Sequence, residues 1–117
     1  MQHQVTIFHN PRCSKSRTTL KIVKELGIEP IIIEYLKNPP SCEEIKEIID
    51  KMGVSPRDIM RTNEPVYLKK NLNNQNLSNE ELIHAINENP ILLERPIVLA
   101  GEGAVIGRPP ESILKIL

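Results

Sequence analysis

The alternation of apolar and polar residues along the first third of the chain predicts a strand, a helix and a second strand. Residues 5–9 alternate as a strand does, residues 14–26 have helical spacing and end at Gly27, and residues 31–36 are a β-branched run typical of a buried strand. The short joints between these segments indicate a βαβ unit with parallel strands. We therefore place residues 31–33 in the core and expect ligands beyond the carboxyl ends of the strands.

Between residues 41 and 90 the pattern changes to that of short amphipathic helices. Two serines precede a glutamate by three residues, which is the spacing of a capping box ahead of an apolar helical face: Ser41 with Glu44, and Ser78 with Glu81. Another short helix is expected from Ser55-Pro56 until Pro65 ends it, with one more turn over residues 66–70. We interpret residues 41–90 as a helical block between two sheet segments.

The last third of the chain returns to strand patterning. Residues 97–100 and 104–107 are predicted to pair antiparallel across a turn at 101–103, and a final helix over 111–117 is expected to cover the sheet with Ile113, Leu114 and Leu117. The order β-α-β, helical block, β-β-α predicts an α/β protein with a mixed four-stranded sheet, one domain over residues 1–117. It is the order of a thioredoxin-like fold with a helical insertion over 41–90, in which a reactive cysteine opens the first helix and a proline, here Pro96, precedes the third strand.

Composition and charge narrow the classes of function. The 117 residues carry 15 Lys and Arg against 15 Asp and Glu, so there is no general electrostatic drive toward nucleic acid or an anionic membrane. No apolar run approaches the roughly 20 residues that span a bilayer, and residues 1–4 lack the blocks of a signal peptide. With only two cysteines a disulfide scaffold is not expected. We expect a cytoplasmic monomer.

Cys13 is the candidate for chemistry because it lies where the first strand turns into the first helix. The first N–H groups of a helix have no partner within it and favour a negative charge. Arg12, Lys15 and Arg17 place three cations beside the sulfur in sequence. We expect a lowered pKa and a good nucleophile near neutral pH. The alternative, an inert buried thiol, is disfavoured by these polar neighbours.

Several cysteine motifs are excluded by inspection. A Cys-x-x-Cys dithiol would need a cysteine where Ser16 stands, and a Cys-x5-Arg phosphatase loop would need an arginine where Thr19 stands. No set of His and Cys has the spacing of a zinc site. Cys42 lies in an acidic capping turn and is interpreted as incidental, and His84 is placed on the polar side of its helix. A single thiol can attack a substrate once, so an outside thiol of the glutathione or glutaredoxin type must finish the cycle.

Residues 9–17, His-Asn-Pro-Arg-Cys-Ser-Lys-Ser-Arg, resemble the His-Asn-Pro-x-Cys-x-x-Ser-Arg signature of the glutaredoxin-coupled arsenate reductases. Four further segments resemble motifs of that family in the same order: 35–40, 60–64, 94–98 and 107–111. The resemblance covers essentially the whole chain. The length of the chain resembles that of a shorter branch of the family.

The resemblance implies a role for each matching residue. It makes Cys13 the nucleophile, assigns the oxyanion to Arg61, Arg95 and Arg108, and has His9 and Ser16 keep the thiol ionised, Ser16 by donating a hydrogen bond. Arg17 and Asn10 are implied to support substrate binding, and Pro96 to follow a cis peptide bond.

The resemblance also implies a reaction, the reduction of arsenate to arsenite. Glutathione would be the co-substrate and glutaredoxin the protein partner, with no metal and no bound cofactor. Two alternatives stay open at this point. One is a regulatory protein of the same fold that binds RNA polymerase, although many such proteins use a Cys-x-x-Cys switch that Ser16 excludes. The other is a reductase of a different thiol-reactive substrate.

Overall fold

The structure is a computed structural model that describes residues 4–117. The chain forms two compact units, a sheet unit made of the residues up to Asn38 together with Arg95–Leu117, and a helical unit made of Pro39–Glu94. The predicted insertion over 41–90 falls within the helical unit. The assignment of the whole chain to one domain stays a prediction.

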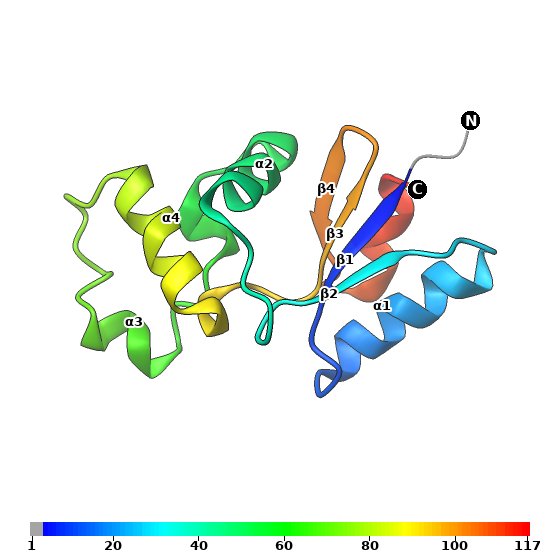
Figure 1. Cartoon of the computed structure of the whole chain (residues 1–117), viewed down its shortest axis with the longest axis horizontal. Helices are drawn as coiled ribbons and strands as arrows, with labels where there is room; N and C mark the ends of the chain where they lie inside the picture. The colour runs from blue at the N-terminus through cyan, green and yellow to red at the C-terminus, as the bar shows by residue number, and fades with distance from the viewer. Residues whose placement is uncertain (1–3) are drawn as a thin grey trace. The chain divides into compact units, whose positions relative to one another are not determined.

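The sheet unit holds four strands in the order β2-β1-β3-β4: β1 (Val5–His9), β2 (Ile31–Glu34), β3 (Ile97–Ala100) and β4 (Gly103–Ile106). In Figure 1 they lie together with α1 (Ser14–Glu25). Strands β1 and β2 are parallel, whereas β3 runs antiparallel to both β1 and β4. The predicted mixed sheet and its thioredoxin-like order are confirmed.

One core cluster joins the sheet to the helices beside it. Val5 and Ile7 of β1 and Val98 of β3 pack with Val23 of α1 and Ile113 of the C-terminal 3-10 helix η3 (Pro110–Lys115). Burial of such side chains is the main favourable term in folding. The cluster therefore fixes α1, and with it the residue that precedes α1, against the sheet.

Two expectations about the ends of the sheet unit are wrong. Strand β2 is an edge strand with one neighbour, and its Ile31 and Ile32 are 43% and 41% exposed rather than in the core. At the C-terminus, Leu114 and Leu117 are 52% and 40% exposed. The η3 segment is a 3-10 helix, in which positions i and i+3 share a face, so Ile116 joins Ile113 over the sheet instead.

The helical unit contains α2 (Cys42–Met52), η1 (Pro56–Ile59), α3 (Pro65–Lys69), α4 (Asn79–Glu88) and η2 (Pro90–Leu92). Both predicted capping boxes are present, at Ser41 and at Ser78. Helices α2 and α4 pack through the buried residues Ile45, Ile48, Ile49, Leu82, Ile83 and Ile86.

Pro65 was expected to end a helix and instead begins α3, because proline is favoured in a first turn. Arg57 then ties α3 to the loop that follows it. Its guanidinium donates to the Tyr67 hydroxyl at 2.6 Å and to the Asn74 carbonyl at 2.7 Å.

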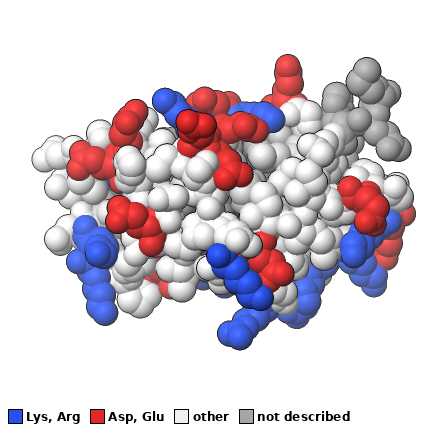
Figure 2. Space-filling model, in the orientation of Figure 1, with Lys and Arg blue, Asp and Glu red and all other residues white. Residues whose placement is uncertain are grey.

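Surface charge agrees with the composition. Figure 2 shows side chains of both signs on the visible face, and the formal net charge is zero. None of the helices in residues 4–117 has the length and apolar character needed to cross a membrane.

Gly107, which follows β4, lies close to both α1 and Pro96. A Cβ atom there would lie 2.7 Å from Thr19 Oγ1 of α1 and 2.8 Å from Pro96 Cγ. We predict that Gly107→Ala lowers the free energy of unfolding by about 1–3 kcal/mol, because the added methyl forces α1 and Pro96 apart. Denaturant unfolding measures this. Glu102→Ala, at an exposed turn residue, is the control and is expected to change stability by less than about 0.5 kcal/mol. Equal stability of Gly107→Ala and the wild type contradicts the prediction.

Candidate functional site

The sheet register brings three loops to one edge of the sheet unit. Phe8 of β1 pairs with Ile97 of β3, and Ile97 pairs with Ile106 of β4. Because these pairs are antiparallel, the chain leaves β1, enters β3 and leaves β4 at the same end. The segments 9–17, 95–96 and 107–108 therefore meet, although they are about ninety residues apart in sequence.

Cys13 is the residue that immediately precedes α1. Its own N–H donates to the Asn10 carbonyl at 3.0 Å, and its carbonyl accepts from Arg17 N–H at 3.0 Å. These bonds close a tight turn between β1 and α1, and the backbone at Cys13 is extended. The Asn10 side chain stabilises the same turn by accepting from Arg12 N–H at 3.0 Å. The sulfur is partly exposed at the positive end of the helix.

Four interactions act on the charge of the Cys13 sulfur besides its burial. Burial raises the pKa of the Cys13 thiol. The pKa is lowered by hydrogen bonds from the Ser16 backbone, the Arg95 side chain and the Lys15 backbone, and by the charge of Arg95. Together these four interactions outweigh burial, so the pKa of Cys13 is below its ordinary value. Donors aimed at a thiolate stabilise the ionised form. A fraction of Cys13 larger than in a free thiol is therefore nucleophilic near neutral pH.

The predicted lowering of the Cys13 pKa is confirmed, and so is the predicted contribution of the first N–H groups of the helix, but the predicted contribution of the three neighbouring cations is wrong. Arg12, Lys15 and Arg17 are exposed, and none of their side-chain charges is among the groups that shift the sulfur. The Arg17 guanidinium instead donates to the Pro11 carbonyl at 2.9 Å. Solvent screens exposed charges, whereas oriented backbone N–H groups and the partly buried Arg95 are screened less.

A buried polar group of three residues lies under the turn. His9 Nδ1 and Ser16 Oγ are 2.6 Å apart, and Asn10 N–H donates to the same Ser16 oxygen at 3.1 Å. All three side chains are at least nine-tenths buried. The hydroxyl of Ser16 is thus held by His9 and Asn10, while the backbone N–H of Ser16 is the group that hydrogen-bonds the sulfur.

His9 is held toward its neutral form. Burial lowers the pKa of His9, the charge of Glu34 opposes that change and the charge of Arg17 adds to it, with a net lowering. Glu34 faces His9 because the two residues are partners in the β1–β2 register. Sequence reasoning did not single out Glu34, and a correct strand alignment is the signal that could have found it.

Arg95, Pro96 and Arg108 form the other side of this edge. The Arg95–Pro96 bond is cis, as the resemblance implied, and Arg108–Pro109 is a second cis bond that was not expected. Arg108 Nε donates to the Arg95 carbonyl at 2.8 Å, and Gly107 N–H donates to the Pro96 carbonyl at 2.9 Å. The Arg95 Nε is buried and has no hydrogen-bond partner among the described residues.

Arg61 belongs to the helical unit. Its backbone N–H donates to the Leu92 carbonyl at 2.6 Å, and its guanidinium is 3.3 Å from the Glu64 carboxylate. One terminal nitrogen, Nη1, is buried without a hydrogen-bond partner among residues 4–117. The assignment of Arg61 to the oxyanion stays a prediction.

Residues 4–117 contain no cluster of three or more His, Cys, Asp or Glu side chains arranged to hold a metal ion. The groups that gather at this edge are a thiolate, backbone N–H donors and guanidinium groups. Such a set binds a small anion and attacks it, because the donors neutralise the charge of the anion while the sulfur supplies the electron pair.

Comparison with known proteins gives concordant matches over nearly the whole chain. The model of the ArsC family matches residues 8–116. The chain is 48% identical to the uncharacterized protein YfgD of Escherichia coli K12, covering 100% of this chain and 99% of that protein. It is 49% identical to a Haemophilus influenzae protein named arsenate reductase, covering 97% and 98%. A solved structure named arsenate reductase, from Vibrio cholerae, superposes with a TM-score of 0.96 at 44% identity, covering 100% of both chains.

We predict that Arg95 sets the reactivity of Cys13. Arg95→Gln removes a hydrogen bond and a positive charge from the thiolate, so the pKa of Cys13 rises and alkylation at pH 7 slows several-fold. The rate of iodoacetamide alkylation between pH 5 and 10 measures this. Arg12→Gln is the control, because Arg12 adjoins Cys13 in sequence but is not among the groups that shift its pKa. Equal effects of the two substitutions contradict the assignment.

We predict that His9 makes stability depend on pH below 6.5. A lowered pKa in the folded state means that the unfolded chain binds the proton first as pH falls. The contribution of His9 is therefore complete above pH 6.5, the ordinary value, and is lost as pH falls through the lower folded-state value. Denaturant unfolding should show a slope of at most about 1.4 kcal/mol per pH unit from this group. His9→Gln should flatten that slope, and an unchanged slope contradicts the prediction.

Proposed function

The chain belongs to the ArsC family, and from this premise we propose that it is an arsenate reductase that converts arsenate to arsenite at Cys13. Relatives named arsenate reductase support the reaction, at 49% identity in Haemophilus influenzae and 44% in the solved Vibrio cholerae structure. The observation that carries the proposal is the lowered pKa of Cys13 beside Arg95. In this proposal the Cys13 sulfur attacks the substrate, and the Arg95 guanidinium beside it binds the oxyanion.

We propose that arsenate binds through guanidinium groups. The Arg95 Nε is a buried donor without a partner among the described residues, and leaving such a donor unpaired costs about 1–3 kcal/mol. An oxyanion oxygen satisfies it. Arg108 fixes the Arg95 backbone through its Nε bond to the carbonyl. The family signature implies Arg61 as a further ligand of the oxyanion, and that assignment stays a prediction.

The proposed first step is attack by the Cys13 thiolate on arsenic. A sulfur–arsenic bond forms, and one arsenate oxygen leaves as water after protonation. The backbone N–H groups of Lys15 and Ser16 then lose their thiolate partner and become available to the bound oxyanion. Arg95 stabilises the charge as it moves from sulfur to oxygen.

The proposed second step needs an external thiol. Glutathione attacks the Cys13 sulfur, the sulfur–arsenic bond breaks, and its electron pair stays on arsenic, which is reduced from As(V) to As(III) and leaves as arsenite. Cys13 and glutathione are left as a mixed disulfide, which glutaredoxin reduces. Ser16 stands where a resolving cysteine would be in a Cys-x-x-Cys motif, and this supports an outside reductant. Thiol cycles of this kind belong to the reducing cytoplasm.

The polar group under the turn has a positioning role in this proposal. The Ser16 hydroxyl links His9 to the Asn10 backbone at 2.6 and 3.1 Å, and this holds the first turn of α1 so that the Ser16 N–H is aimed at the sulfur. Arg17 braces the same turn through the Pro11 carbonyl. We therefore assign His9, Ser16, Asn10 and Arg17 to keeping the thiolate and its donors in place.

Purified protein with arsenate, glutathione, glutaredoxin and NADPH-coupled recycling tests the proposal. Cys13→Ser is expected to reduce turnover to background, and Arg95→Gln to lower kcat/KM by about 10²–10³-fold, because it removes an anion-stabilising donor. Cys42→Ser should leave turnover unchanged.

If the wild-type protein does not reduce arsenate although its Cys13 reacts readily with alkylating reagents, the assignment of arsenate as substrate is wrong. Turnover that survives Cys13→Ser would remove the proposed nucleophile.

A further inference from the structure

The second cysteine of the chain has a partner that its sequence context does not suggest. Cys42 is the first residue of α2, and its sulfur lies 3.5 Å from Nδ1 of His84 on α4, although the two are 42 positions apart. Cys42 is partly exposed and not in a disulfide. The interpretation of Cys42 as incidental and of His84 as an ordinary surface residue left this pair out of account.

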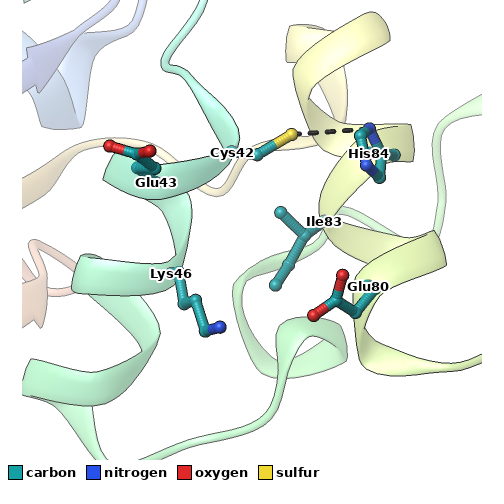
Figure 3. A pocket seen from close by; sticks show the side chains of 6 residues that line it. All are labelled: Cys42, Glu43, Lys46, Glu80, Ile83 and His84. Carbon is teal, nitrogen blue, oxygen red and sulfur yellow. Dashed lines mark hydrogen bonds between the residues drawn. The ribbon is translucent and has the colours of Figure 1, made fainter.

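The pair opens onto a pocket of about 170 Å³ between α2 and α4. Its lining is Cys42, Glu43, Lys46, Glu80, Ile83 and His84. Figure 3 shows Lys46 from α2 and Glu80 from α4 pointing toward one another below the sulfur, with Ile83 between the two helices. All six residues belong to the helical unit, so this pocket is a feature of that unit alone.

The charges of the pocket are unpaired. Neither the Lys46 ammonium nor the carboxylates of Glu43 and Glu80 form an ion pair with another residue in the described part of the chain. An ammonium and a carboxylate that face one another without closing leave room for a molecule with both groups. An amino-acid thiol has such groups, a carboxylate to meet Lys46 and an ammonium to meet Glu80.

We propose that Cys42, with His84 as its proton acceptor, is a second reactive thiol that exchanges with small disulfides of amino-acid thiols and carries the mixed disulfide in this pocket. The Cys42 proton passes to His84 Nδ1, and the thiolate attacks one sulfur of the disulfide. The bond between Cys42 and that sulfur forms, the original disulfide bond breaks, and the other half leaves as a thiolate that takes the proton from His84. Cys42 is oxidised and the leaving half is reduced, so the step needs no other oxidant.

The chemistry of Cys42 and His84 favours disulfide exchange over a contact that only holds α2 against α4. A cysteine beside a histidine loses its proton more readily, because the imidazolium that forms stabilises the thiolate. The sulfur is also at the start of an 11-residue helix, where negative charge is favoured. Glu43 and Glu80 oppose the thiolate, while Lys46 and His84 support it. The proposal does not depend on the arsenate reaction, which uses Cys13.

The chain contains two cysteines, so Cys13→Ser leaves Cys42 as the single thiol and provides the test background. Glutathione disulfide is the probe, and the mass of the intact protein reports the mixed disulfide over pH 5.5–10. An ordinary thiol is only about 3% ionised at pH 7. We expect modification at pH 7 to be about five- to tenfold faster than for the same variant unfolded in urea.

His84→Gln in that background separates proton acceptance from helix packing. The variant is expected to react about five- to tenfold more slowly at pH 7 and to catch up with the parent above about pH 9.5, where any thiol is ionised. A contact that only holds α2 against α4 would slow or speed the reaction equally at every pH. Equal rates at pH 7, or a constant ratio across the pH range, overturns the proposal.

The role of the Lys46 and Glu80 charges is tested by comparing a charged and an uncharged disulfide as probes. Lys46→Gln and Glu80→Gln are each expected to slow reaction with glutathione disulfide several-fold relative to reaction of the same variant with the uncharged 2-hydroxyethyl disulfide, because the ratio of the two rates removes any change in the ionisation of Cys42. Lys69→Gln, at an exposed lysine of α3 outside the pocket, is the control and should change neither rate. Unaltered selectivity in both pocket variants overturns the assignment to amino-acid disulfides.

Discussion

An anionic sulfur held at a protein surface needs donors that solvent does not screen, and the sheet unit is arranged to supply them. Two backbone N–H groups come from the first turn of α1, and a guanidinium comes from Arg95, just before β3. They can meet only because β1 and β3 are antiparallel neighbours, paired at Phe8 and Ile97. The register of this strand pair thus decides whether the Arg95 guanidinium reaches the Cys13 sulfur and lowers the pKa of its thiol.

The same edge depends on buried polar groups that satisfy one another. His9 and Ser16 lie beneath the turn with almost no exposure, and such groups are tolerated only when they are hydrogen-bonded. The short bond between His9 and Ser16 meets this requirement with a neutral imidazole, in line with the lowered pKa of His9. Protonation of the buried His9 imidazole would lower the stability of the fold, and it would destabilise the turn that carries Cys13 in particular.

The two thiols of this chain differ in what stands beside them. Cys13 is stabilised by fixed donors and a guanidinium, which suits attack on an anionic substrate. Cys42 is paired with a histidine, which can accept a proton and return it. Each of the two begins or immediately precedes a helix, and neither position alone would distinguish them. What differs between the two sulfurs is the tertiary neighbour, which is Arg95 for Cys13 and His84 for Cys42.

The sequence by itself determined most of the elements and singled out Cys13 as the candidate nucleophile, because capping boxes, strand alternation and the turn around Cys13 are local signals. It also determined the family, through motifs such as residues 9–17. Only the tertiary structure decided that β2 is an edge with exposed Ile31 and Ile32, that Arg95 rather than Arg12 acts on the sulfur, and that His84 meets Cys42. These outcomes depend on strand order and helix packing, which join residues tens of positions apart and leave no periodic trace in the chain.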